Sequence, residues 1–596
     1  MAKNTNIPTV SIDSLVKDAL KALPEKAPDG LKNLLKLLAS QITPEDAGFF
    51  NGDILAEIAQ THWDLARNRE HGEPKVRIYS PPTDEARFHR TIIDIVSNDM
   101  AFLVDSAVAE VNRHNVLIDH MVHPILFAEY DKNGTLKALH PKDAPGAKKE
   151  GAVRQSHICI QMKDLLAEDV LAQLKQGLLD VLHDVHYANR DWPAMNARMV
   201  EAIEELAGAT TKHSAKEIEK YCGFLEYLKD NNFTFLAYRE YKFEGKGDDL
   251  VSKTVKGKSL GLLADDFKPA YISETEEGLP RNLQELRRKL PPLSISKTNR
   301  ISTVHRRVPM DAVAIKTYDK NGDVTGERLF LGLFTSVTYS RSLGGIPYLR
   351  EKVEAIVGES GFLEGSHDRK ALRHILERYP RDELFQMDEA DLFKTAVSIL
   401  RLQERQRVAL FLRKDPFGRY ISCMIYIPRD RFSSELRQTM IQILEQELQG
   451  QCGNFYTNMD DSVFARVTVT IHISQHNPPK FKAAEIEAQL VDVARTWPER
   501  LSAALYITDK PAEEAKTLTV KYAAAFPVDY PSRYRAKQAI FDIEKIEAAL
   551  SSHFLQLELY RPDDISPRHL RLKLYNPGGP VTLSDVMPIL ENMGLR

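Results

Sequence analysis

The chain has 596 residues, too many for one hydrophobic core, and its length suggests roughly three to five domains. An apolar content of 43% and a charged content of 28% are ordinary for a soluble globular protein. With 80 basic and 84 acidic residues the net charge is −4, which lacks the basic excess of a nucleic-acid-binding protein.

The four cysteines are widely separated and include no Cys-x-x-Cys pair, which argues against a zinc ribbon, a thioredoxin motif or a disulfide scaffold. They are Cys159, Cys222, Cys423 and Cys452. Residues 1–13 lack the apolar core of a signal peptide, and no apolar run approaches the roughly 20 residues that span a bilayer. We therefore expect a cytoplasmic protein with no membrane or nucleic-acid partner.

Residues 11–70 are predicted to be helical, since apolar residues recur at helical spacing in three segments. These segments are 15–23, 31–38 and 52–68. A short strand over 75–80 follows, and a strand over 91–97 leads into a helix that is expected to begin near Met100. Asn115 suits a left-handed turn at the end of this helix, and a β-rich run from Val116 ends at the turn pair Asn133-Gly134.

A strand, a helix and a strand with polar residues at the first turn are typical of small amino-acid-sensing modules of the ACT type. Asn98, Asp99 and Asp105 are the candidate effector-binding residues, because polar groups and free N–H groups at a helix start can receive an amino acid's ammonium or carboxylate. The alternative is that Asn98 and Asp99 only cap the helix, which contributes about 1 kcal/mol.

The amino-acid sequence around this strand and helix resembles the amino-terminal region of the large bacterial NAD-dependent glutamate dehydrogenases. The shared elements are Asn98-Asp99, the helix start Phe102 to Ser106, and the Val-His-Pro of residues 122–124. Residues 231–238, 302–305, 330–342 and 379–387 also resemble the sequences of this family.

After a loop over 140–153, the alternation of Ile158, Ile160 and Met162 predicts a half-buried strand. Helices are expected from Asp164 to about His183 and over 192–207, where an ideal ACT module would return with a fourth strand. This departure leaves a complete module in question.

The next part, to residue 357, is predicted to be an α+β unit of PAS or GAF type. It has a helix over 216–231, strands at 233–243 and 297–307, and a hairpin of 313–318 with 328–336 across a turn ending at Gly322. Helices are then expected at 347–357, 369–378 and 388–406.

A second ACT-like unit with circularly shuffled order is predicted beyond residue 406. It combines a hairpin of 408–413 with 420–428, a helix capped by Ser433 or Ser434, a strand over 465–473, a helix over 483–497 and a strand-like segment at 501–507. The last unit is expected to contain a helix at 543–550, strands in 553–560 and 569–575, and a helix that ends at Met593 before Gly594. It lacks a closing strand, so we expect that the chain is truncated.

The predicted fold class is multidomain α+β, with several ACT-like (ferredoxin-like) modules, a PAS/GAF-like unit and helical connectors. The expected domains are an N-terminal helical segment (1–70), a first ACT-like domain with appended helices (71–212), the PAS/GAF-like domain (213–357), a helical connector (358–406), a second ACT-like domain (407–522) and a truncated third one (523–596).

The sequence offers no cradle for a dinucleotide, because no G-x-G-x-x-G follows a strand and no Walker motif is present. Gly344-Gly345 and Gly578-Gly579 are interpreted as turns. The resemblance implies NAD as the cofactor of the full-length enzyme and a catalytic domain beyond residue 596. We therefore expect no catalytic, cofactor-binding or metal-binding residue in this chain.

Other polar clusters are given structural interpretations. His183 and His186 have helical spacing but no third ligand, and His114, His120 and His123 are not expected to converge. Arg300 with the run 305–307 is interpreted as a solvated edge strand, with anion binding as the alternative. The arginines of 401–413 are balanced by Glu404 and the overall acidic charge.

The hypothesis is a regulatory and oligomerising region of a large NAD-dependent glutamate dehydrogenase, inactive on its own. Its expected partners are further copies of itself, the catalytic domain and an amino-acid effector. The alternative is a free-standing amino-acid sensor or scaffold built from ACT-like modules.

Overall fold

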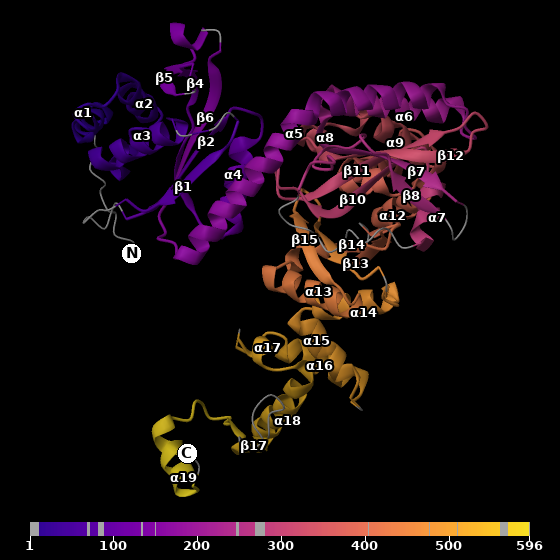
Figure 1. Cartoon of the computed structure of the whole chain (residues 1–596). Coiled ribbons are helices and arrows are strands. Elements are labelled where there is room, and N and C mark those ends of the chain that lie inside the picture. The colour runs from indigo at the N-terminus through magenta and orange to yellow at the C-terminus, as the bar shows by residue number, and fades with distance from the viewer. Residues whose placement is uncertain are drawn as a thin grey trace. The chain divides into compact units, whose positions relative to one another are not determined.

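The computed structural model describes residues 11–67, 69, 72–81, 89–132, 135–148, 151–245, 250–268, 281–402, 405–475, 477–508, 510–527, 529–560 and 570–594. The chain divides into two compact units, residues 1–396 and 397–596, and each is described by itself (Figure 1). The predicted turn at Asn133-Gly134 and the side chain of Glu404 lie outside the described residues.

The first unit begins with a helical layer, as the apolar spacing predicted. Its helices are α1 (Ile12–Ala22), α2 (Asp29–Ala39) and α3 (Gly52–Arg67). Leu31, Leu34, Leu35 and Leu38 of α2 are almost fully buried in the core that this layer shares with the first sheet.

The first sheet is antiparallel throughout, with the strand order β1-β2-β6-β4-β5 and with β3 also paired to β6. Its strands are β1 (Lys75–Tyr79), β2 (Thr91–Asn98), β3 (Ile118–Val122), β4 (Ile125–Tyr130), β5 (Leu136–Pro141) and β6 (Val153–Met162). Both β3 and β4 pair with β6, one after the other along its length.

The place of the expected fourth ACT strand is filled from upstream. In this sheet β1 pairs with β2, on the side of β2 away from β6. The module is therefore complete but circularly permuted, because the strand that would return after the second helix precedes the first strand instead.

Helices cover both faces of the first sheet. The layer α1–α3 packs on one face, and α4 (Leu103–Arg113) with α5 (Glu168–Gly208) packs on the other. In consequence β6 is buried from Gln155 to Met162 on both of its faces. The prediction of a half-buried strand there was wrong, because the alternation does not reveal the helical layer.

A single helix, α5, replaces the two helices predicted between 164 and 207. Its 41 residues run through Pro193 without ending. Residues before and after the proline are buried, for example Val185, Ala188, Met195 and Met199. Burial along both halves therefore outweighs the backbone hydrogen bond that proline removes.

The second sheet is also antiparallel, with the order β10-β11-β12-β7-β8 and with β9 paired to β7. The predicted hairpin is confirmed, and the predicted basic strand ends earlier, at Ile301. The elements of this region are α6 (Ala215–Tyr227), β7 (Phe233–Glu244), β8 (Val251–Thr254), β9 (Leu260–Gly261), α7 (Arg281–Lys289), β10 (Leu293–Ile301), β11 (Pro309–Tyr318) and β12 (Val324–Phe334).

One core joins the two sheets of this unit. It contains Ile93 and Ile158 of the first sheet, Val181 of α5, and Leu236 and Leu333 of the second sheet. Helix α5 therefore packs against both sheets, and it runs alongside both in Figure 1.

A helical segment follows, whose last helix begins in the first unit and ends beyond residue 396, and its three predicted helices are confirmed within a few residues. It contains α8 (Ser336–Ser340), α9 (Pro347–Glu359), α10 (His367–Glu377), α11 (Arg381–Gln386) and α12 (Glu389–Leu402). The short helix α11 was not predicted.

The second unit opens with a four-stranded antiparallel sheet in the order β13-β14-β16-β15. Ser433 caps its first helix by accepting a hydrogen bond from the Leu436 amide, as predicted. The elements are β13 (Ala409–Lys414), β14 (Tyr420–Pro428), α13 (Ser434–Glu447), β15 (Gln451–Asn458), β16 (Phe464–His472) and α14 (Ala483–Val493). This is the permuted order of the first sheet, and it confirms the predicted shuffling.

A helical group with its own core follows, and Trp497, Leu501, Leu505 and Tyr522 are buried in it. The predicted strand over 501–507 was wrong, because these residues lie in α15 and at its end. The helices are α15 (Trp497–Tyr506), α16 (Ala512–Tyr522), α17 (Tyr530–Arg533) and α18 (Ala536–Ser552).

The last described elements repeat the opening of the two ACT-like sheets. Strand β17 (Gln556–Tyr560) pairs antiparallel with β18 (Arg571–Tyr575), and α19 (Leu583–Asn592) follows. Helix α19 ends at Asn592, one residue before the predicted end at Met593, and Gly594 has a left-handed φ of +77°. In contrast to α4 and α13, α19 buries no residue.

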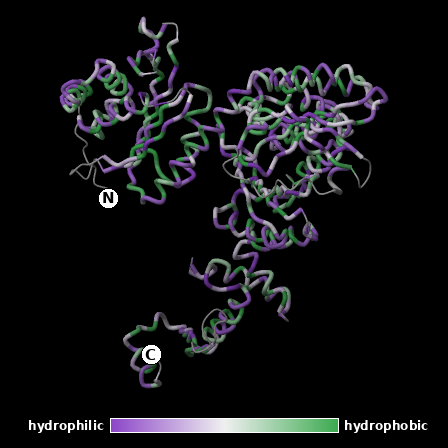
Figure 2. The backbone as a smooth tube through the Cα atoms, in the orientation of Figure 1, coloured by the Kyte–Doolittle hydropathy of each residue, from purple (hydrophilic) through white to green (hydrophobic). Residues whose placement is uncertain are grey.

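Hydrophobic residues are interrupted by hydrophilic ones along the helices (Figure 2). Among the described residues, no helix has the length and apolar character needed to cross a membrane.

Candidate functional site

The structure places Asn98 at the end of β2, where its side chain binds Arg69 and does not cap the next helix. The Asn98 Oδ1 atom accepts a hydrogen bond of 2.5 Å from Arg69. Helix α4 begins at Leu103, and the residue before it, Phe102, has a left-handed φ of +69° and provides no side-chain cap. The capping interpretation of Asn98 was therefore wrong.

Asp99, the next residue, binds Arg154. Its N–H donates to the Arg154 carbonyl at 3.0 Å, and its carboxylate lies 2.7 Å from the Arg154 guanidinium. The Asp99 side chain is 11% exposed and that of Arg154 is 58% exposed. Asp99 does not cap α4 either, and it presents a shielded anion beside an accessible cation.

Asp105 lies in the first turn of α4, as predicted, and contacts the loop after β10. Its carboxylate is 2.8 Å from His305 Nδ1, and the His305 amide donates to Ser106 Oγ at 2.8 Å. Asp105 therefore connects the first ACT-like domain to the second sheet.

The three candidate residues do not converge on one point, since each binds a different cationic or imidazole side chain. Asn98 and Asp99 are neighbours, and Asp105 lies in the first turn of α4 with a partner of its own. Amino-acid binding by these residues stays a prediction.

A polar face buried beneath α3 was missed by the sequence analysis. The polar face consists of four alternate residues of β6, Gln155, His157, Cys159 and Gln161, together with Asp94 and Asn98 of β2, between which the apolar Val96 lies on the same face. In the ladder, Asp94 lies opposite Cys159 and Asn98 lies opposite Gln155. The alternation of polar residues over 155–161 was the available signal. It does not show that a layer of helices covers these residues, so it did not predict that they are buried.

Several hydrogen bonds hold the polar face in place. The Tyr79 hydroxyl donates to Asp94 Oδ2 at 3.0 Å, Gln155 donates to the Tyr130 hydroxyl at 2.6 Å, and Arg90 donates to Gln161 at 2.7 Å. Above them, His62 of α3 has its Nε2 atom 3.1 Å from Asp94 Oδ1.

Burial controls protonation on the polar face. It lowers the pKa of His157 well below the ordinary value, and the nearby His62 and Arg69 lower it further. Burial also raises the pKa of the Cys159 thiol and of the Tyr79 phenol, with Asp94 adding to both effects. At neutral pH these three groups are therefore uncharged.

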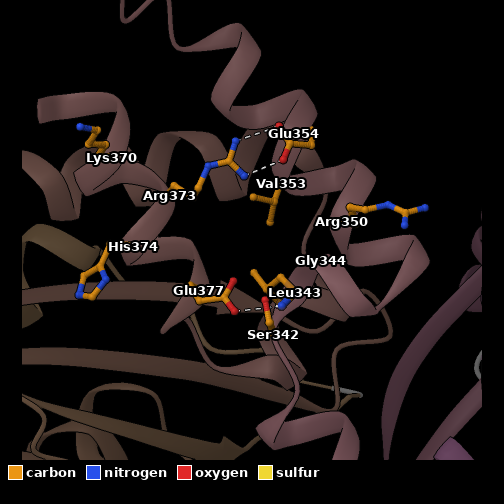
Figure 3. Close-up of a pocket in the computed structure, with 10 residues that line it drawn as sticks. All are labelled: Ser342, Leu343, Gly344, Arg350, Val353, Glu354, Lys370, Arg373, His374 and Glu377. Atoms are coloured by element: carbon orange, nitrogen blue, oxygen red, sulfur yellow. Dashed lines mark hydrogen bonds and ion pairs between the residues drawn. The ribbon is translucent and has the colours of Figure 1, made fainter. Parts of the chain in front are cut away.

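A hollow of about 510 Å³ lies against α9 and α10, next to the turn Leu343–Gly345 (Figure 3). Arg373 reaches Glu354 through two hydrogen bonds of 2.6 and 2.9 Å, and Glu377 accepts the Leu343 amide at 3.0 Å. These contacts satisfy the two carboxylates. Arg350 and Lys370 add positive charge to the rim.

The histidines singled out from the sequence form no metal centre in the described part of the chain. His114 lies near Glu110, His120 near Asp46, and His123 binds Ser156. His183 stacks on Phe267 at a ring distance of 5.5 Å. Within the described ranges, the group of His, Cys and acidic side chains close enough to share an ion is His62, Asp94 and Cys159.

Strand β10, which contains Arg300, is an edge strand of the second sheet, as predicted, but residues 305–307 lie beyond its end and contact other parts of the unit. His305 contacts Asp105, Arg307 contacts Glu110 at 3.2 Å, and Arg306 donates to the Phe334 carbonyl at 2.6 Å. Arg300 approaches the Leu262 carbonyl at 3.5 Å.

The two glycine pairs are turns, as predicted. Gly344 and Gly345 lie in a 3₁₀ turn, and Gly579 has a φ of +123° after the turn at 577–578. Every strand pair among the described residues is antiparallel.

Family models of glutamate dehydrogenase match five segments of the chain. Three describe ACT domains, ACT1 at residues 34–178, ACT2 at 409–498 and ACT3 at 554–596. Two describe helical motifs, motif 1 at 346–405 and motif 2 at 507–549. The ACT1 match includes α3 and the polar face, whereas the second sheet lies outside these five segments.

Curated relatives match almost the whole chain. The NAD-specific glutamate dehydrogenase of Halomonas elongata is 34% identical over 542 residues, and that of Pseudomonas aeruginosa is 31% identical over 536. The enzyme of Mycobacterium tuberculosis is 25% identical over 556 residues. Each alignment covers 90% of this chain, but the chain spans only about a third of the length of these relatives, 33%, 33% and 32%.

Proposed function

We propose that this chain, which belongs to the family of large NAD-specific glutamate dehydrogenases, is a regulatory and assembly region that does not itself carry out dehydrogenation. The reaction of the whole enzyme is the oxidation of L-glutamate by NAD to 2-oxoglutarate, ammonium and NADH. In this proposal NAD is the cofactor of the whole enzyme and is not bound by these 596 residues.

The observation that carries the proposal is the repeated ACT topology. Each of the three segments matched by an ACT model contains an antiparallel strand pair followed by a helix, namely β1-β2-α4, β13-β14-α13 and β17-β18-α19. Such modules bind small effectors or join subunits.

The strand pairing supports the catalytic part of the proposal. A dinucleotide-binding unit needs adjacent parallel strands, and a Gly-rich turn that leads into a helix whose N-terminus receives the pyrophosphate. The described sheets have antiparallel neighbours, and the glycine pairs form simple turns. The proposal therefore assigns hydride transfer to other parts of the whole enzyme.

Asp99 and Arg154 are the proposed effector-binding pair, next to Asn98. A free amino acid carries an ammonium and a carboxylate on one carbon, so it complements a carboxylate and a guanidinium that lie side by side. Because these two groups are 2.7 Å apart in the structure, an entering ligand would replace their mutual ion pair with one contact to each. Asp105 is proposed to support this turn through His305.

The second sheet is proposed to be a PAS- or GAF-like sensor unit. Its order β10-β11-β12-β7-β8 places the first strand, β7, between the last strand and the second strand, an order typical of PAS folds. We also propose that the chain forms homo-oligomers through its ACT domains. A free-standing sensor or scaffold remains the second candidate, since the topology supports it equally.

The test is the thermal stability of the purified chain in a panel of amino acids, with Asp99→Asn and Glu354→Gln compared with the wild type. Glu354 is the matched control, because it is also a carboxylate paired with an arginine, in the hollow of Figure 3. We expect at least one amino acid to raise the melting temperature of the wild type and of Glu354→Gln but not of Asp99→Asn. Equal responses of both variants, or no response of the wild type, would contradict the assignment of Asp99.

A further inference from the structure

The buried contact between α3 and the first sheet brings together three groups that commonly bind metals. His62 lies on α3, Asp94 on β2 and Cys159 on β6, and all three side chains are fully buried. Asp94 and Cys159 are direct partners in the β2–β6 ladder. The three side chains therefore meet where the helical layer covers the centre of the sheet.

The donor atoms are close together, and within the described part of the chain those of His62 and Asp94 lack hydrogen-bond partners. One donor atom from each residue lies within 4.8 Å of the other two. Among the described residues, neither His62 nitrogen nor Asp94 Oδ1 has a hydrogen bond of acceptable geometry, although Nε2 and Oδ1 are 3.1 Å apart. Leaving buried polar atoms without partners costs about 1 to 3 kcal/mol each, so the site requires an explanation.

A neighbouring hydroxyl holds the Asp94 carboxylate in place. The Tyr79 hydroxyl binds the other carboxylate oxygen, Asp94 Oδ2, at 3.0 Å. Such a bond from a neighbouring group is what usually fixes a ligating carboxylate. His157, whose two ring nitrogens also lack partners among the described residues, has its ring 5.4 Å from that of His62.

We propose that His62, Asp94 and Cys159 bind a divalent cation of the zinc type, which joins the α1–α3 layer to the first sheet. Imidazole, carboxylate and thiolate are the ligands zinc takes in proteins, whereas calcium and magnesium take oxygen ligands. The carboxylate and the thiolate together neutralise the two positive charges. On binding, the Cys159 S–H bond breaks, the sulfur keeps the electron pair and binds the metal, and the proton passes to solvent.

The site makes the helical layer part of the ACT1 domain and not an appendage. His62 is contributed from outside the strand–helix–strand core of the module, so the cation would fix the layer in one position on the sheet. This inference is independent of the proposed function, because it depends on neither effector binding nor turnover.

The test is metal binding by the whole purified chain, with Cys159→Ala compared with the control Cys423→Ala. Cys423 is an equally buried thiol, on β14 in the second unit. We expect the wild type and Cys423→Ala to retain zinc at a ratio near one ion per chain, and the Co²⁺ forms of both to show thiolate-to-metal absorption. Cys159→Ala should lose this absorption.

A second variant keeps the test decisive if Cys159→Ala fails to fold. Tyr79→Phe removes only the hydroxyl that orients Asp94, and we expect it to weaken zinc binding by about 10- to 100-fold. Retention of no zinc by the wild type would overturn the proposal, as would an unchanged cobalt spectrum in Cys159→Ala or an unchanged affinity in Tyr79→Phe.

Discussion

Three charged side chains are buried together at the second sheet, namely Lys316 of β11, Glu327 of β12 and Arg287 of α7. The Glu327 carboxylate accepts hydrogen bonds from Lys316 at 2.6 Å and from Arg287 at 2.7 Å. Glu327 and Lys316 are each 2% exposed, and Arg287 is 8% exposed. One anion therefore serves two buried cations.

Glu327→Gln should destabilise the protein by about 3 to 5 kcal/mol, since it leaves Lys316 and Arg287 without a counter-charge in a dry environment. The control is Glu244→Gln, which removes a pair with Lys253 whose side chains are 56% and 62% exposed. That change should cost less than about 1 kcal/mol. Chemical denaturation of both variants measures the difference, and equal losses would contradict this account.

The same carboxylate predicts a pH dependence. Burial opposes ionisation of Glu327, but Arg287 and Lys316 outweigh it and hold its pKa below the ordinary value of 4.5. A carboxyl whose pKa is lower in the folded state contributes stability that is complete above the unfolded pKa and is lost on acidification. The advantage of the wild type over Glu327→Gln should therefore shrink as the pH falls below 4.5. Denaturation at a series of pH values tests this, and an advantage that grows on acidification would be the opposite result.

The residues of the candidate effector site could be located from sequence, but their partners could not. Asn98 and Asp99 stood out as a polar pair between a strand and a helix. Their contacts are with Arg69 and Arg154, which come from other parts of the domain. The polar face was missed for the same reason, because His62 belongs to a separate layer of helices that comes before Asp94 in the chain.

At the scale of elements, the short strand β9 depends on a glycine that contacts α5. Gly261 has a φ of +62°, and its amide donates to Asp191 Oδ2 of α5 at 2.7 Å. A Cβ atom at this position would lie 2.2 Å from the Leu236 carbonyl oxygen. Both the backbone conformation and the space therefore require glycine.

Gly261→Ala should destabilise the protein by about 1 to 3 kcal/mol more than Gly257→Ala. Gly257 is the matched control, because its φ is +70° but nothing lies within 4 Å of an added Cβ. Its replacement should cost only the left-handed backbone penalty, about 1 kcal/mol. Thermal unfolding of the two variants compares them, and equal melting temperatures would show that the contact with Leu236 is unimportant.

Most helices and strands were predictable from periodicity and capping, and the errors have physical causes. A break between about His183 and residue 192 was predicted, but buried residues on both sides of Pro193 keep α5 continuous. In the segment 501–507 the apolar residues suggested a strand. There the capping box of Thr496 and Glu499 was the available helix signal.

At the scale of the whole molecule, the ACT domains share a permuted strand order. The sequence alone predicted this order only in part. The shuffled order of the second ACT domain was predicted, whereas the first was expected to lack a strand. In the structure β1 and β13 occupy the same edge position in their sheets. Both domains therefore follow one plan, in which the edge strand comes first in the chain.

We propose that these residues regulate and assemble the enzyme but do not transfer hydride. The most direct measurement is the near-ultraviolet absorbance of NADH when the purified 596-residue chain is incubated with L-glutamate and NAD, beside a full-length relative as positive control. We predict no NADH from the chain while the relative produces it. Formation of NADH in proportion to the concentration of the purified chain would contradict the account, provided that inhibitors of contaminating dehydrogenases do not abolish it.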